Sequence, residues 1–317
     1  MPTLAFVAIG DWGGQDVAPY TQPGQLATAK GLARTAGALG ASLYETLAPY
    51  NDTCPSRMDP ASGTVDDARF AQTFEGVYSA AALQVPWQVI AGNQDALGNV
   101  SASIAYSARS LRWRHPHYWH SVSAPLWAGA PPTARVDIHM IDTTLCYGIV
   151  IDAWHTAMCA EQLAWLDAAL AASADAAFLF VAGHYPIFSA CAHGNTQWAI
   201  DEVLPRLRRA RASGYLSGHD HCLEHLDTGG LVFVVSGAGD GCCYALSNVA
   251  AVPEGSLSFA VAADRNPSNV SGGFASFRAG RDAASRKLLL TVSYHGDDGA
   301  PLWAAPPLEA RNATVAV

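Results

Sequence analysis

Short apolar runs recur along the chain, and most of them end in glycine and a polar residue. They are LAFVAIGD (4–11), WQVIAGNQD (87–95), VDIHMIDT (136–143), AFLFVAGH (177–184), GYLSGHDH (214–221) and LVFVVSGAG (231–239). Runs this short, rich in Val, Ile and Phe and bounded by turn residues, are typical of buried strands. The pattern therefore predicts six buried strands.

Helical periodicity fills three of the intervals between these runs, at residues 24–40, 159–173 and 198–213. Pro205 lies inside the third interval and is expected to kink or shorten that helix. Strands that alternate with helices predict an α/β layered fold. The apolar face of the first helix is expected to hold Leu26, Ala29, Leu32, Ala33 and Ala36.

The end of the chain has a different pattern. From about residue 273 the stretches GFASFRAG and KLLLTVSYHG predict an antiparallel hairpin, so we expect mixed sheets. The only clear long loop is residues 50–66, and no internal repeat or long linker is visible. We therefore predict one domain that spans residues 1–317.

Composition excludes several classes of protein. Half of the 317 residues are hydrophobic and 14% are charged, which indicates a compact globular chain and not a disordered one. The net charge of −9 argues against binding to nucleic acid, and no apolar run reaches the roughly 18 residues of a membrane span. A negative net charge does not exclude a phosphate-ester substrate, because bound cations reverse the local charge.

Processing signals are mixed. The start, MPTLAFVAIG, leads directly into a strand, so no signal peptide is visible. Four N-x-S/T triplets nevertheless favour a glycoprotein of secreted ancestry. They begin at Asn51, Asn99, Asn269 and Asn312.

Seven cysteines without a C-x-x-C pair do not form a disulfide framework for a chain of this length. The sequence allows a bridge between Cys146 and Cys159, and it allows Cys222 to pair with Cys242 or Cys243. Buried free thiols are the interpretation that we favour for most of the others.

Polar side chains follow the predicted strands at the places where sites form in open α/β sheets. They are Asp11, Asn93, His184, His219 and His221. Nitrogen and oxygen ligands without thiolate suit Zn, Fe or Mn. One such histidine alone is typical of a structural residue, but five candidates at strand ends predict a metal site. Asp220, between the last two histidines, is expected to point away from it.

The motifs around these residues are GDWGG, GNQDALGNVSASIAYS, VAGHYPIFSACAHG and SGHDHCLEHL. They resemble the calcineurin-like metallophosphoesterase superfamily, and more narrowly the mammalian-type purple, or tartrate-resistant, acid phosphatases. The resemblance covers about residues 4–298. It implies a four-layer αββα sandwich with mixed sheets that hydrolyses small phosphate monoesters through a metal-activated water, best at mildly acid pH. It also implies a secreted or lysosomal location, and we expect a monomer.

Motif matching implies two metal ions, ferric iron plus iron, zinc or manganese. Asp11 and His221 match the ligands of the first ion, and the second ion matches Asn93, His184 and His219. The family has two histidines that can protonate the leaving group. One corresponds to Gln94, whose amide can hydrogen-bond a phosphate but cannot act as a general acid. The other corresponds to His193, which would carry that task alone.

The family string GDNFY, which supplies a bridging aspartate and a tyrosinate, is missing. An ungapped match places Pro49 and Asp52 at those two positions. Loss of a shared carboxylate leaves the repulsion between two cations less screened and weakens at least one ion. Three interpretations stay open: an error in the gene model near residues 42–65, an enzyme with one tight metal, or a pseudo-phosphatase that acts as a binding protein. Each predicts no purple charge-transfer colour.

Other conspicuous patterns have simpler interpretations. His225 forms H-x-x-x-H with His221, but we interpret it as structural because His221 should lie on a loop. The stretch SGAGDG (236–241) is interpreted as a tight turn near the site, and HPHYWH (115–120) as packing beside it. The basic end of the third helix is interpreted as solvated; it contains Arg206, Arg208, Arg209 and Arg211.

Overall fold

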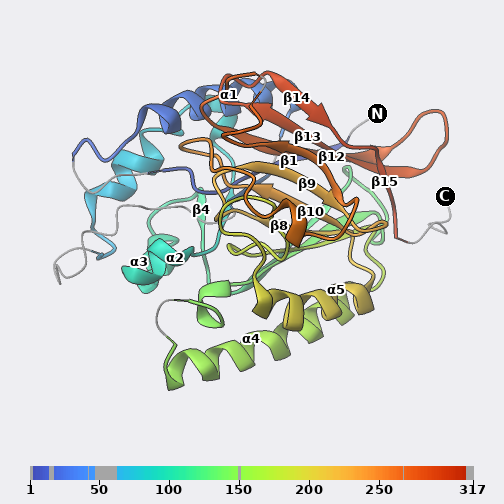
Figure 1. Cartoon of the computed structure of the whole chain (residues 1–317), viewed down its shortest axis with the longest axis horizontal. Helices are drawn as coiled ribbons and strands as arrows, with labels where there is room; N and C mark the ends of the chain where they lie inside the picture. The colour runs from blue at the N-terminus through green and yellow to red at the C-terminus, as the bar shows by residue number, and fades with distance from the viewer. Residues whose placement is uncertain are drawn as a thin grey trace.

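The computed structural model describes residues 3–13, 18–41, 43–46, 63–148, 151–266 and 268–311, with only the backbone for 43–46. Within these residues two mixed sheets pack face to face, and helices lie outside them (Figure 1). This arrangement confirms the four-layer αββα sandwich. No helix in the described part of the chain is long and apolar enough to cross a membrane.

The first sheet has the order β14-β13-β12-β1-β2-β3-β4, with β15 paired to β13. Strands β1 to β4 run parallel, and β12 pairs antiparallel with both β1 and β13. The predicted C-terminal hairpin is therefore confirmed. The strands are β1 (Leu4–Ile9), β2 (Leu43–Thr46), β3 (Trp87–Val89), β4 (Trp113–Arg114), β12 (Gly273–Arg281), β13 (Leu288–Gly296), β14 (Pro301–Ala304) and β15 (Leu308–Glu309).

The second sheet has the order β11-β9-β10-β8-β7-β6-β5. Its centre, from β6 to β8 and β10, is parallel, whereas β5, β9 and β11 pair antiparallel. The strands are β5 (His120–Pro125), β6 (Arg135–Met140), β7 (Phe178–Ala182), β8 (Gly214–Ser217), β9 (Leu223–Asp227), β10 (Val232–Ser236) and β11 (Leu257–Val261).

Strand burial explains why the predicted runs are apolar throughout. In β1, Phe6 points into the core between the sheets, while Val7 and Ile9 point into a core beneath the outer helices. In β7, Phe180 and Val181 divide between the inner core and the outer core in the same way. A strand buried on both faces has no polar face, so its sequence cannot alternate.

Helices cover the two outer faces separately (Figure 1). Helix α1 (Pro23–Leu39) packs on the first sheet, whereas α4 (Ala153–Ala172) and α5 (Leu204–Ala210) pack on the second. The remaining elements are short: α2 (Asn93–Leu97), α3 (Val100–Tyr106), the π turns η1 (Phe70–Glu75) and η4 (Ala199–Val203), and the 3-10 turns η2 (Ala81–Leu83), η3 (Thr143–Leu145) and η5 (Val249–Ala251).

Several local expectations need correction. Helix α4 begins six residues before the predicted 159, because the Asp152 side chain accepts the backbone N–H of His155 and caps it. The predicted third helix divides at Pro205, which sits in the first turn of α5 after a π turn. Arg208, Arg209 and Arg211 are exposed, as predicted. Only Arg206 is half-buried, where it forms an ion pair with Asp167 of α4.

The disulfides also differ from expectation. Cys146 and Cys159 are bridged, as the sequence allowed. Cys222 pairs with Cys191 and not with Cys242 or Cys243, which pair with each other. The preference for free thiols was therefore wrong among the described cysteines. Cys191 and Cys222 are 31 positions apart and become neighbours only when the segments after β7 and β8 lie side by side. Cys54 lies outside the described residues.

Candidate metal centre

The predicted metal ligands come from the carboxyl ends of four strands. Asp11 follows β1 and Asn93 follows β3, both in the first sheet, whereas His184 follows β7 in the second sheet. His219 and His221 follow β8, next to β7. The site therefore forms where the two sheets meet, because parallel strands deliver their carboxyl ends to one edge.

Three of these side chains converge on one point. The Nε2 atom of His184 lies 2.6 Å from Oδ1 of Asn93 and 3.2 Å from Nδ1 of His219. A single ring nitrogen cannot both donate and accept along these two directions when it is neutral. Ligands that each lie about 2.0–2.2 Å from one ion are roughly 2.8–3.6 Å apart. The separation of His184 and His219 fits a shared divalent cation, and Asn93 lies slightly inside that spacing.

Asp11 forms a second part of the site. Its Oδ2 accepts the backbone N–H of His219 at 2.6 Å, and its Oδ1 lies 3.9 Å from Nε2 of His221. This Oδ1 atom is buried and has no hydrogen-bond partner among the described residues. A buried carboxylate oxygen without a donor fits a cation ligand, because leaving it bare is costly.

The protonation of Asp11 supports the same interpretation. Burial raises its pKa well above its usual value, and the nearby carboxylates of Asp240, Asp95 and Asp220 raise it further. The backbone N–H of His219 acts in the opposite direction and lowers the pKa. Several carboxylates around one buried carboxylate make a strongly negative environment, which a bound cation would stabilise.

Two imidazoles of the site, those of His219 and His221, are held neutral. Burial lowers the pKa of His221 to about 4, with a further contribution from His193. Burial also lowers the pKa of His219 far below its usual value, assisted by His184, His193 and His221. Neutral imidazole is the form that binds metal ions, so these histidines are in the ligand state at neutral pH.

Backbone geometry positions the ligands at a cost. Asp11 and His219 adopt positive φ angles of 49° and 70°, which residues other than glycine rarely take. Such conformations cluster at functional sites. The SGAGDG turn lies against them as expected, since a Cβ atom at Gly237 would come within 2.1 Å of the Asp220 backbone oxygen and 3.0 Å of Asp11 Oδ2.

The two predicted catalytic residues lie differently. Gln94 is the second residue of α2, half-buried beside Asn93. His193 is exposed, and its ring stacks on His219 with centroids 4.3 Å apart. A proton donor in the leaving-group path has to be both reachable and close to the ligands, and His193 meets these two conditions.

Tyr244 also lies at the site, although no sequence motif predicts it. Its ring stacks on His221, with the centroids 4.6 Å apart, and meets the ring of His193 edge-on at 5.3 Å. It follows the SGAGDG turn by three residues, and only its proximity to these histidines identifies it. The other missed residues are Ser189, whose hydroxyl donates to Asp220, and Glu224, whose Oε1 lies 3.5 Å from the same hydroxyl. Asp220 points away from the ligands as expected, toward Ser189 and the backbone of His193.

The fold shows only which strand leads toward the position of the missing bridging ligand. Strand β2 pairs with both β1 and β3, so it ends between the strands that lead to Asp11 and Asn93. Pro49 and Asp52 lie outside the described residues. Strand β2 itself was absent from the predicted strands, because its four residues lack a long apolar run.

The fold is consistent with a structural role for His225 and with packing for the HPHYWH stretch. His225 lies on β9, buried, with Nδ1 3.1 Å from the hydroxyl of Tyr294. In HPHYWH, His115 is buried against Ser103, and His117 packs edge-on to Trp119. The rings are held by packing, although Nε2 of His115 and both ring nitrogens of His120 are buried without a hydrogen-bond partner among the described residues.

The sequence is similar to those of several known acid phosphatases. The chain is 39% identical over 284 residues to tartrate-resistant acid phosphatase type 5 of Sus scrofa, covering 86% of this chain and 79% of the relative. The human protein of the same name is 38% identical over 269 residues, covering 81% and 79%. Purple acid phosphatase 3 of Arabidopsis thaliana is 31% identical, covering 75% of this chain and 63% of that protein.

Solved structures share the fold at low identity. An inner-membrane-complex anchor of Plasmodium superposes with a TM-score of 0.78 and 17% identity, covering 99% of this chain and 91% of that chain. A purple acid phosphatase from yellow lupin seeds superposes with a TM-score of 0.63 and 14% identity, covering 95% and 53%. No family model matches the sequence. On the identity to the type 5 enzymes, the chain belongs to the tartrate-resistant, purple acid phosphatase family of metallophosphoesterases.

Proposed function

We propose that the chain hydrolyses phosphate monoesters with two unequal cations, each held by ligands from both sheets where the sheets meet. Membership of the acid phosphatase family supports the metal-dependent reaction and a small phosphate-ester substrate. The proposal is carried by the position of His184 Nε2, which lies 2.6 Å from Asn93 Oδ1 and 3.2 Å from His219 Nδ1.

In this proposal Asn93, His184 and His219 hold the tighter ion, a divalent zinc, manganese or iron. Asp11 and His221 hold the other, ferric iron by resemblance, and this ion is weaker because the shared carboxylate of the family is missing. When bound there, such ions would supply charge neutralisation of the phosphate and a lowered pKa for the attacking water. The chain orients that reaction by fixing its ligands at strand ends.

The leaving group needs a proton, and this step falls to His193. Its ring is exposed and stacks on His219, so it borders the space in front of the ligands. Gln94, beside Asn93, supplies a hydrogen bond to the phosphate but no proton. Tyr244 forms an aromatic wall beside both histidines, where the organic part of a substrate would lie.

The alternative is a binding protein that keeps the fold with an impaired site. The Plasmodium protein of the same fold is named an anchor, but its 17% identity to this chain carries only the fold. The much higher identity to named phosphatases favours catalysis.

The test compares the wild-type chain with His184→Ala after loading with zinc, manganese or iron. We expect wild type to hydrolyse 4-nitrophenyl phosphate and to bind metal, and His184→Ala to lose both. His117→Ala, an exposed histidine outside the site, serves as the matched control and should behave as wild type. Equal background rates in wild type and His184→Ala, with no metal bound by either, would favour the binding protein.

A further inference from the structure

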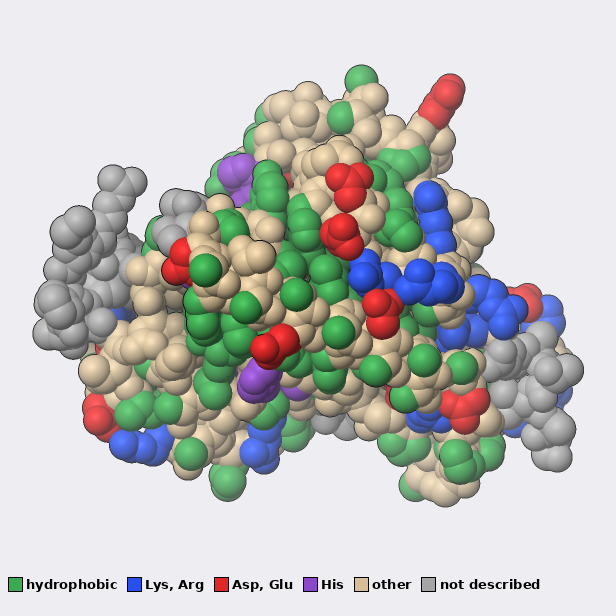
Figure 2. All heavy atoms as spheres, turned by 90° about the horizontal axis from the view of Figure 1, so that it is seen from below, with side chains coloured by type: hydrophobic (Ala, Val, Ile, Leu, Met, Phe, Trp, Pro, Cys, Tyr) green, Lys and Arg blue, Asp and Glu red, His purple; other side chains and the backbone are tan. Residues whose placement is uncertain are grey.

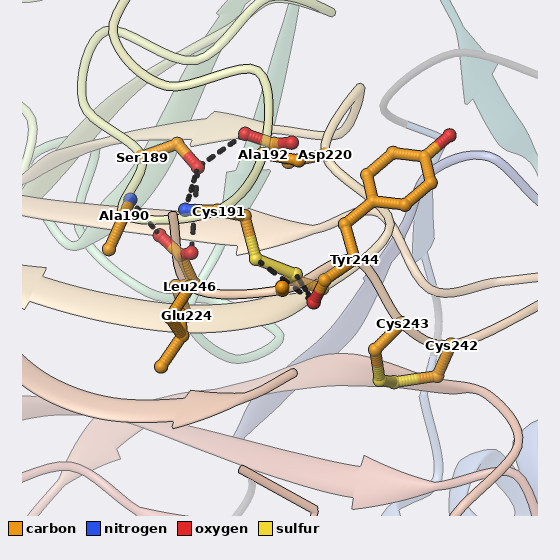
Figure 3. The surroundings of a disulfide bond; sticks show 12 residues. Ser189, Ala190, Cys191, Ala192, Asp220, Glu224, Cys242, Cys243, Tyr244 and Leu246 are labelled. Atoms are coloured by element: carbon orange, nitrogen blue, oxygen red, sulfur yellow. Dashed lines mark hydrogen bonds between the residues drawn. A yellow bond between two sulfur atoms is a disulfide. The ribbon is translucent and has the colours of Figure 1, made fainter. Parts of the chain in front are cut away.

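The loop that carries His193 is joined covalently to the loop that carries the metal ligands. Cys191 lies two residues before His193, and its disulfide partner Cys222 directly follows His221 (Figure 3). Both cysteines are fully buried, with Cα atoms 6.8 Å apart. The bridge therefore ties the segment after β7 to the segment after β8 at the edge of the site.

A buried carboxylate reinforces this connection. Oδ1 of Asp220 accepts the backbone N–H of His193 at 2.9 Å, and Oδ2 accepts the hydroxyl of Ser189 at 2.5 Å. The same hydroxyl oxygen accepts the backbone N–H of Cys191 at 3.1 Å. One side chain between His219 and His221 thus holds both ends of the segment 189–193.

Further partners fix the middle of the segment. Oε2 of Glu224, on β9, accepts the backbone N–H of Ala190 at 3.0 Å (Figure 3). The side-chain amide of Asn248 donates to the backbone oxygens of Cys191 and Ala192 at 2.5 and 3.1 Å. Residues 189–193 form neither helix nor strand, yet their backbone groups are paired much as those in regular structure are.

This support contrasts with the exposure of the residue that it carries. The His193 side chain faces solvent, but its stacking on His219 requires a fixed backbone. A general acid loses about a hundredfold in rate when it is displaced by about 1 Å. An exposed ring on an irregular loop would otherwise sample many positions.

We propose that the Cys191–Cys222 disulfide, with Asp220, Ser189 and Glu224, is a positioning device that holds His193 over the metal ligands for proton donation. This inference rests on the proposed function, in which His193 protonates the leaving group. The cysteines and carboxyls do not touch substrate; they act through His193.

The test uses kinetics with two leaving groups in the full-length, metal-loaded chain. In Cys191→Ala/Cys222→Ala, kcat for glycerol 2-phosphate should fall about tenfold to a hundredfold. The fall for 4-nitrophenyl phosphate should be much smaller, because its leaving group needs little protonation. KM and metal content should stay near wild type. Cys146→Ala/Cys159→Ala, which removes the other long-range bridge, should show no such difference between substrates.

A double-mutant cycle isolates the path through His193. His193→Ala should show the same leaving-group dependence, and removing the bridge in that background should cost nothing more. Equal losses with both substrates, or a further loss in the His193→Ala background, would overturn the positioning role. If His193→Ala is impaired and the bridge variant is not, only the positioning proposal fails. If His193→Ala retains full turnover of glycerol 2-phosphate, the assignment of His193 fails and the positioning role with it.

A readout without activity keeps the inference testable if the chain proves inactive, which would count against the proposed function alone. The ring protons of His193 should show the upfield NMR shifts of a stacked ring, and these shifts should move toward free-histidine values in Cys191→Ala/Cys222→Ala. Unchanged shifts would overturn the proposal. Non-reducing peptide mapping adds a second check, because the ligating atoms of Cys191, Cys222 and Glu224 lie within 4.8 Å of one another. Free thiols with a bound zinc ion would overturn the bridge.

Discussion

The two sheets contribute to the site in different ways. The second sheet supplies His184, His219 and His221 on loops that are stitched together: the backbone N–H of Gly218 donates to the oxygen of His184 at 3.1 Å, and the Cys191–Cys222 bridge lies behind them. The first sheet supplies Asp11 and Asn93, and between them β2 leads to residues outside the described structure.

The second sheet therefore contributes well-supported neutral ligands, whereas the first sheet contributes the negative charge. Neutral imidazoles need precise support but bring no charge to offset a cation, whereas the first sheet brings the carboxylate. We therefore expect the second-sheet ligands to keep their geometry and the first-sheet side to limit metal binding. The following predictions are ordered from the largest expected effect to the smallest.

Removing His184 should have the largest effect, because it deletes the centre of the three converging ligands. Mutating residues that merely orient a ligand costs about 10–100-fold, so His184→Ala should lower kcat/KM by more than about a hundredfold. Steady-state assays and metal analysis measure this. A variant with wild-type metal content and rate would contradict the second-sheet assignment.

Trp12 supports the first-sheet side, directly after Asp11. It is buried in an aromatic cluster, with Tyr78 edge-on at 5.4 Å and Trp113 at 6.3 Å. Trp12→Ala should lower the free energy of unfolding by about 3–5 kcal/mol and weaken the ion at Asp11. The matched variant Phe233→Ala, in the outer core of the second sheet, should cost a similar amount in urea denaturation but leave metal binding intact. Equal metal loss in both variants would remove the distinction.

Glu224, on β9 of the second sheet, should make the unfolding free energy depend on pH. Burial raises the pKa of this carboxyl from 4.5 to about 8, partly offset by the N–H of Ala190. A raised carboxyl pKa favours the folded state fully below about pH 4.5, and that advantage is lost as pH rises to about 8. The unfolding free energy of wild type should therefore fall by a few kcal/mol relative to Glu224→Gln between pH 5 and 8.5. If the difference in unfolding free energy between the two proteins is the same at both pH values, Glu224 does not titrate as described.

The two ions should differ in affinity by at least about tenfold, the lower bound for losing an important partner of a metal ligand. After dialysis we expect about one ion per chain, with the second restored by excess metal. Titration followed by elemental analysis distinguishes the sites. Two ions retained with equal affinity would show that another group replaces the bridging carboxylate.

Much of the ligand chemistry could be predicted from local patterns. A strand buried on both faces must be apolar, so β1, β3, β7 and β8 appear as runs, and the polar residue after each run marks a candidate ligand. The residues that support the site could not be found in this way. Ser189 and Glu224 lie inside the motifs around the histidines, but no local pattern marks them as supporting residues. Tyr244 lies outside every motif, and β2 is too short to leave a pattern.

The sequence by itself determined the layered class, the strand ends and the chemical type of each candidate ligand, because these depend on neighbours a few residues apart. Only the tertiary structure decided which sheet each ligand came from, that Cys191 joins Cys222, and that Asp220 spans Ser189 and His193. Those contacts link residues from 27 to more than 200 positions apart. Their energies depend on burial and on mutual distance, and neither quantity exists until the two sheets have packed.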